Sequence, residues 1–163
     1  MRSFSNLWYW IALAVMWSTA SHWVLGVPFD MVTRAAKFGG THEADLDDLA
    51  RVNVRRILMI GQVSGLWLLG LVCFTLTCLA LLGFVYGIEF AQAVFLLAMP
   101  MSLVGLLSLS NARLVQDRAL TGPPLIHRLT RHRIFVQLIG VVSIFVTALW
   151  GMYQNMTIGP LGG

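Results

Sequence analysis

Four long runs without a charged side chain constrain this 163-residue chain more than any other feature of its sequence. The runs predict helices at about 7–27, 57–86, 90–112 and 134–155. Each run reaches the roughly 20 apolar residues that a helix needs to cross a bilayer. None alternates as a membrane β-strand does, whereas a helix in lipid satisfies its own backbone hydrogen bonds. We therefore expect an all-α integral membrane protein.

The composition leaves too little polar surface to cover a water-soluble globule. Hydrophobic residues make up 58% of the chain and charged residues 11%, whereas soluble domains average about 45–50% and about 25%. The length suits one domain, so residues 1–163 are predicted to form a single transmembrane four-helix bundle. The net charge of +4 follows from membrane topology, and we expect no nucleic-acid partner.

All but one of the Lys and Arg residues lie in two segments, 28–56 and 113–133. Positive charge is retained on the cytoplasmic side of a membrane, so both segments are predicted to be cytoplasmic loops and both termini to lie outside (N-out, C-out). Of the 11 Lys and Arg residues, only Arg2 falls elsewhere. The other basic residues are Arg34, Lys37, Arg51, Arg55, Arg56, Arg113, Arg118, Arg128, Arg131 and Arg133.

The first loop is predicted to be helical rather than a plain linker. A short interfacial helix over 29–38 should end at the two glycines, 39–40. A second helix, capped by Thr41, should run unbroken into the second span as a projecting cytoplasmic extension. Asp47 and Arg51 have the spacing of a helical ion pair. The first turns of this extension are acidic, with Glu43, Asp45, Asp47 and Asp48.

Small residues recur at helical spacing and predict close helix packing. Gly61 and Gly65 form a GxxxG motif, which lets two helix backbones approach closely. We favour packing inside the bundle over a surface reserved for another chain. The predicted packing residues are Gly61, Gly65, Gly105, Gly140, Ser143, Thr147 and Gly151. Interhelical hydrogen bonds are expected from Gln62, Gln92 and Gln137.

His22 is the only ionisable side chain well inside an apolar run, and it is the one candidate for a cofactor ligand or a proton carrier. Its place near the cytoplasmic end of the first run also fits a neutral imidazole at the interface. His132 is the candidate for a second haem ligand at similar depth. Cys73 and Cys78 point about 140° apart on one helix, so they cannot share a metal. We expect no cofactor, no metal and no catalytic site, because no enzyme motif is present.

A basic run leads into the fourth helix. Its arginines are predicted to hold anionic lipid headgroups at the cytoplasmic surface, as such clusters commonly do. The residues concerned are Arg128, Arg131 and Arg133.

Four segments carry a resemblance to a known family: SFSNLWYW at 3–10, VSGLWLLG at 63–70, PMSLVG at 100–105 and ALWGMYQN at 148–155. The chain resembles a family of small, uncharacterised bacterial inner-membrane proteins often labelled as a component of the SufBCD complex. The resemblance implies a multi-pass protein of the bacterial inner (plasma) membrane and a link to iron-sulfur cluster assembly. The two cysteines lie within a predicted span, so the chain would dock an assembly machine rather than hold a cluster.

These features together predict a non-enzymatic accessory or assembly subunit of an inner-membrane protein complex. Its expected partners are membrane lipids, other membrane subunits or further copies of itself, and a cytoplasmic protein. The alternative is a small oligomeric transporter or channel, although the near absence of charge inside the spans disfavours ion transport by a monomer. A haem or quinone electron carrier would depend on His22. The run at 7–27 is interpreted as a retained helix, with a cleaved signal peptide as the alternative.

Overall fold

The computed structural model describes residues 7–157, and this part of the chain is almost wholly helical. A two-residue β-hairpin separates the first two helices, and a single π-helical turn, η2, ends the longest helix. The elements in chain order are α1 Leu7–His22, β1 Trp23–Val24, β2 Val27–Pro28, α2 Phe29–Phe38, α3 Thr41–Ala80, η2 Leu81–Val85, α4 Glu89–Asp117 and α5 Gly122–Thr157.

Three helical segments are long and apolar enough to cross a membrane: Thr41–Val85, Glu89–Asp117 and Gly122–Met156. They contain the second, third and fourth predicted runs. The first helix was predicted at 7–27 but is shorter in the structure: α1 has 16 residues and ends at His22. At about 1.5 Å per residue such a helix is about 24 Å long, less than the roughly 30 Å of a hydrocarbon core.

The β-hairpin explains why α1 stops before residue 27. Its turn places Leu25 and Gly26 at positive φ, 52° and 77°, a conformation that ends a right-handed helix. Leu25 is only 4% exposed, so burial of its side chain offsets the strain of that backbone. The Asn53 amide of α3 donates a hydrogen bond of 3.2 Å to the Gly26 carbonyl and holds the turn in place.

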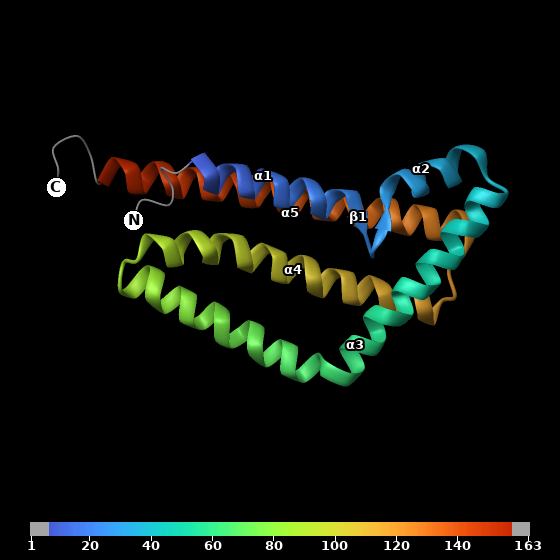
Figure 1. The fold of residues 1–163 in the computed structure, drawn as a ribbon, viewed down its shortest axis with the longest axis horizontal. Coiled ribbons are helices and arrows are strands. Elements are labelled where there is room, and N and C mark those ends of the chain that lie inside the picture. The colour runs from blue at the N-terminus through green and yellow to red at the C-terminus, as the bar shows by residue number, and fades with distance from the viewer. Residues whose placement is uncertain (1–6, 158–163) are drawn as a thin grey trace.

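The helices form an open, layered arrangement (Figure 1). Helix α4 lies between α3 on one side and the antiparallel pair α1 and α5 on the other. Both ends of the described chain lie at the same end of the molecule as the turn before α4. In their most apolar windows, 6% of α3 but 28% of α5 is buried. The apolar half of α3 is therefore an edge of the assembly, covered on one side only.

Most of the deeply buried residues lie at the opposite end, in a unit that we call the head. The head comprises the hairpin, α2, the first half of α3, the end of α4 and the start of α5. Its core contains Leu25, Val27, Val32, Ala35, Leu46, Ala50, Val54, Leu58, Ala112, Val115, Leu125 and Leu129. A smaller cluster further along the helices contains Leu13, Trp17, Val104 and Val136.

The head corrects the prediction of a projecting extension. Helix α3 does begin at Thr41 and run unbroken to Ala80, which confirms the helical continuity. Its first half does not project, however, because Leu46, Ala50, Val54 and Leu58 recur every four residues and bury one face. Nor does the Thr41 side chain cap the helix, since Gly40 occupies the N-cap position without a side-chain bond.

The two predicted loops are also more ordered than expected. Helix α2 has the predicted bounds, and Gly39 and Gly40 follow it at positive φ. The segment 113–133 was predicted as a loop, but α4 continues to Asp117 and α5 begins at Gly122. Only four residues separate the two helices. The two prolines after Gly122 fall in the first turn of α5, where no backbone N–H is needed.

Candidate functional site

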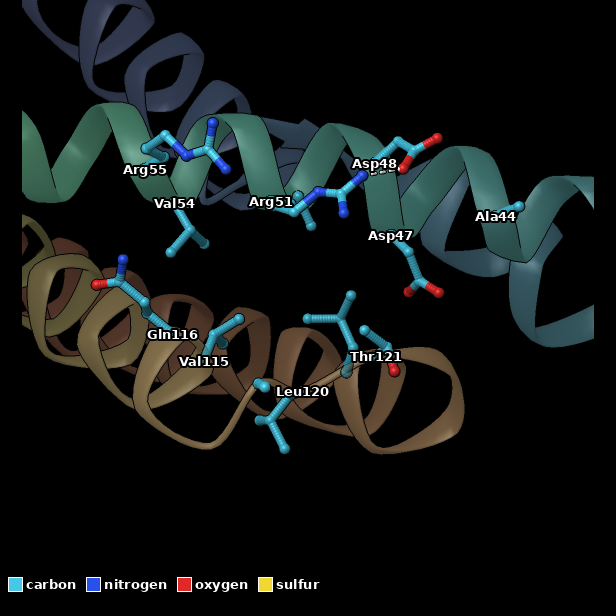
Figure 2. Close-up of a pocket in the computed structure, with 13 residues that line it drawn as sticks. Ala44, Asp47, Asp48, Arg51, Val54, Arg55, Val115, Gln116, Leu120 and Thr121 are labelled. Carbon is cyan, nitrogen blue, oxygen red and sulfur yellow. Dashed lines mark hydrogen bonds and ion pairs between the residues drawn. The ribbon is translucent and has the colours of Figure 1, made fainter.

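The main concavity of the head is a groove of about 600 Å³ between α3 and the turn that joins α4 to α5. We call it the head groove. Figure 2 shows Asp47 of α3 pointing toward the α4–α5 turn and Val54 pointing toward the end of α4. The floor is apolar and the rim is charged. The residues lining it are Ala44, Asp47, Asp48, Ala50, Arg51, Val54, Arg55, Val115, Gln116, Ala119, Leu120, Thr121 and Leu125.

A helix cap fixes one end of the head groove. The Asp47 carboxylate accepts a hydrogen bond of 2.9 Å from the backbone N–H of Gly122, the first residue of α5. A carboxylate at this position satisfies a free backbone donor and complements the positive end of the helix dipole. The cap joins α3 to α5 across 75 residues of sequence, so the groove has a defined shape.

The charges on the rim differ from the predicted pairing. Arg51 pairs with Asp48, three residues before it, and not with Asp47. The Asp47 carboxylate instead accepts a hydrogen bond from the first residue of α5. The next arginine along this rim, Arg55, is exposed and forms no ion pair within residues 7–157. The head groove therefore combines an apolar floor with an arginine that has no ion-pair partner, Arg55, and a carboxylate, Asp47, that accepts a backbone N–H.

A buried polar cluster between α4 and α5 was missed by the sequence analysis. The Asn111 amide donates hydrogen bonds to the Leu107 carbonyl, at 2.8 Å, and to Nδ1 of His132, at 3.0 Å. The other ring nitrogen of His132 lies 3.3 Å from the Ser108 hydroxyl. His132 is 2% exposed, and this arrangement suits a neutral imidazole that accepts at Nδ1 and donates at Nε2.

The two histidines proposed as haem ligands are in different surroundings. The His22 ring is about half exposed and its Nε2 lies 3.9 Å from the Asp30 carboxylate. Both nitrogens of His132 face polar side chains of α4, so His132 could bind a metal only by losing one of these contacts. Across the described residues no group of three or more His, Cys, Asp or Glu side chains could hold a metal ion.

Comparisons with known proteins do not extend this description. Neither protein-family models, nor curated proteins, nor solved structures match the chain.

The predicted packing residues differ in how closely neighbouring atoms approach them. A Cβ added at Gly140 would lie 2.9 Å from the Trp17 ring, and one at Gly61 would lie 3.0 Å from Leu109. At Gly65 and Gly105 an added Cβ would meet no described atom within 4 Å. The other three predicted packing residues, all on α5, are buried: Ser143, Thr147 and Gly151.

Gln92 makes the interhelical bonds that were predicted for it. Its amide nitrogen donates to the Gly83 carbonyl of η2 at 2.7 Å, and its oxygen accepts from the Trp150 indole of α5 at 3.0 Å. The side chain thus joins three elements at the end of the molecule opposite the head. Gln62 and Gln137 are exposed in this chain.

The three arginines predicted to bind lipid headgroups differ in availability. Arg133 donates to the Ser21 carbonyl at 3.2 Å, and its guanidinium lies 3.9 Å from the centre of the Phe29 ring. It therefore ties α5 to α1 and α2. Arg128 is half-buried, and its Nε has no hydrogen-bond partner among the described residues. Only Arg131 is exposed, and its guanidinium lies over the Phe135 ring.

Proposed function

We propose that the chain is a non-enzymatic accessory or assembly subunit of a bacterial inner-membrane complex and that its head docks a cytoplasmic protein. The observation that carries this proposal is the head groove. A folded unit with its own core presents there an apolar floor beside a charged rim. Protein-binding surfaces commonly combine an apolar centre with a polar rim.

The proposed topology has four spans, with the head in the cytoplasm and both termini outside. The basic segments 28–56 and 113–133 supply most of the head, which supports this orientation. Helix α1 lies alongside α5 and antiparallel to it (Figure 1), as expected if α1 is the fourth spanning helix. Its short length would be accommodated by local thinning of the bilayer or by flanking residues at the interface.

The groove rim favours an occupant with an acidic group next to apolar side chains. Arg55 is the unpaired cation at this rim, while Asp48 already neutralises Arg51. An amphipathic helix with a carboxylate would place its apolar face on Val54 and Val115 and its charge beside Arg55. Because the floor residues belong to the core of the head, the groove is pre-formed and costs little ordering on binding.

The resemblance described above adds one candidate partner, a cytoplasmic iron-sulfur assembly complex. Cys73 and Cys78 lie in the apolar half of α3, far along the helix from the head. The proposed role toward such a complex is therefore docking, with the cluster held elsewhere.

The test is purification of the tagged chain from its native membrane in mild detergent, with mass spectrometry of copurifying proteins and an absorption spectrum. Two neighbouring exposed arginines of α3 provide a matched pair, because Arg55 lines the groove and Arg56 does not. We expect a stoichiometric soluble partner that is lost in Arg55→Glu and retained in Arg56→Glu.

Three outcomes would contradict the proposal. Equal retention of the partner by both variants would remove the groove from the binding site. A colourless homo-oligomer without any partner would favour the small transporter or channel, and substrate-dependent flux in liposomes would then be measured. A Soret band in the spectrum would favour a haem protein.

A further inference from the structure

A second concavity, of about 460 Å³, lies on α4 where this helix enters the head. Its residues from Leu106 to Asp117 recur along one face of α4 at the spacing of successive helical turns, and Arg118 lines the same concavity from just beyond the end of the helix. The thirteen residues from Leu106 to Arg118 span about 18 Å along the helix axis. We call this surface the α4 face.

The α4 face changes from apolar to cationic along its length. Leu106 is 56% exposed and begins the apolar part. Ser110 follows, and then Arg113, the first charged residue after the uncharged run of this helix. Arg113 and Arg118 are both exposed and neither forms an ion pair inside the 7–157 segment. Asp117 is the single acid of this surface, so the polar part has a net positive charge.

We propose that the α4 face binds an anionic phospholipid. The acyl chain would lie along Leu106 and Leu109, and the phosphate would lie between Arg113 and Arg118 with Ser110 as a further donor. The order of these side chains matches the order of the parts of a phospholipid at a membrane surface. The arginine fork also suits phosphate oxygens, to which it can donate two parallel hydrogen bonds.

This site differs from the headgroup site predicted on α5. There, Arg133 is already engaged by Ser21 and Phe29, Arg128 is half-buried, and only Arg131 is exposed. On α4 the two arginines are free to meet a ligand, and an apolar surface adjoins them on the membrane side. The proposal requires that α4 spans the membrane, but it does not depend on docking at the head groove.

The test is native mass spectrometry of the detergent-purified full chain, titrated with phosphatidylglycerol or with phosphatidylcholine. We expect the wild-type chain to prefer phosphatidylglycerol. Each basic residue near an anionic surface contributes about a fivefold preference, so Arg113→Gln/Arg118→Gln should lower it by about thirtyfold. The matched variant Arg34→Gln/Arg56→Gln removes two exposed arginines outside the α4 face and should retain the preference.

Further measurements keep the proposal falsifiable. The single variant Arg118→Gln, just beyond the end of α4, should lose about fivefold even if the double variant folds poorly. Millimolar inorganic phosphate should not displace the lipid, and displacement would identify a site for a free anion instead. Equal losses in the two double variants, or no headgroup preference in the wild-type chain, would show only a diffuse basic surface and overturn the proposal.

Discussion

The contact between α1 and α5 makes a quantitative prediction at Gly140. A Cβ at this position would lie 2.9 Å from Cε3 and 3.2 Å from Cδ2 of Trp17. Trp17 is 4% exposed and packs in the cluster with Leu13, Val104 and Val136. The two contacted atoms belong to the fused ring, which cannot rotate away locally. The variant Gly140→Ala must therefore shift the whole indole or separate the two helices.

The cost follows from a comparison with glycines that have free space. Replacing a helical glycine by alanine gains about 0.5–1 kcal/mol in helix stability, whereas overpacking a well-packed site costs about 1–3 kcal/mol. The helical gain is common to Gly140, Gly65 and Gly105, so it cancels between variants. We expect Gly140→Ala to be about 1–3 kcal/mol less stable than Gly65→Ala or Gly105→Ala.

The assay is equilibrium unfolding of the purified chain in mixed micelles of a mild detergent and dodecyl sulfate, followed by helical circular dichroism. Reversibility should be shown first, because the comparison needs equilibrium free energies. If Gly140→Ala is as stable as both controls, the Trp17 ring does not pack on α5 as described. In that case the proposal that α1 is a fourth spanning helix would lose its main packing contact.

Three further predictions test contacts elsewhere. In Gly83→Ala the new Cβ would lie 2.9 Å from a backbone nitrogen of α4 that cannot move aside. This variant should lose at least as much unfolding free energy as Gly140→Ala. Equal stability to wild type in the same micelle assay would contradict this. His132→Leu and Asn111→Leu should each lower the unfolding free energy by about 1–3 kcal/mol. Their double variant should lose less than the sum of the two single losses, because the two side chains bond each other. Strict additivity would show that the two side chains act independently. Asp47→Ala removes the cap of α5 and should lower the unfolding free energy by about 0.5–2 kcal/mol. Asp48→Ala removes an exposed ion pair and should lower it by about 0–1 kcal/mol. A larger loss in Asp48→Ala than in Asp47→Ala would refute the assignment of the cap.

The helices themselves could be predicted because a charge-free run in lipid must satisfy its own backbone hydrogen bonds, which a helix does. The runs at 57–86, 90–112 and 134–155 all lie in helices that are apolar and long enough to cross a bilayer. The end of α1 could not be predicted in this way. It depends on a leucine at positive φ, which is costly locally and is stabilised by burial of Leu25 in the head and by the hydrogen bond from Asn53 to the turn.

The head was underestimated because its segments are rich in charge. Four-residue spacing from Leu46 to Leu58 is visible in the sequence and indicates a buried face. What covers that face, Leu125 and Leu129 among others, lies about 70 residues later in the chain and adjoins a basic run. A hydropathy value averaged over all residues of such a segment is polar, although one side of the helix is apolar.

The site residues illustrate the same limit. Spacing alone permits Arg51 to pair with Asp47 or with Asp48, and only the position of α5 decides between them. The pairing of Asn111 with His132 joins two helices that the sequence analysis placed on either side of a loop. Exposed Arg55 and Arg56 are indistinguishable in the sequence, yet only Arg55 lines the head groove. The helices and their buried faces were predictable, while the partners of individual side chains were not; for Gln92 the sequence predicted interhelical hydrogen bonds but not the groups that form them.

The end of α4 separates the two proposed binding sites, and their tests are therefore independent. Val115 and Gln116 line the head groove, whereas Arg113 and Asp117 lie on the α4 face. Residues 113 and 117 share one side of the helix, and residue 115 points about 160–200° away from both. Substitution of exposed arginines on the lipid side leaves the groove floor intact. Loss of the lipid preference would thus say nothing against docking at the groove, and loss of the protein partner in Arg55→Glu would leave the lipid site unchanged.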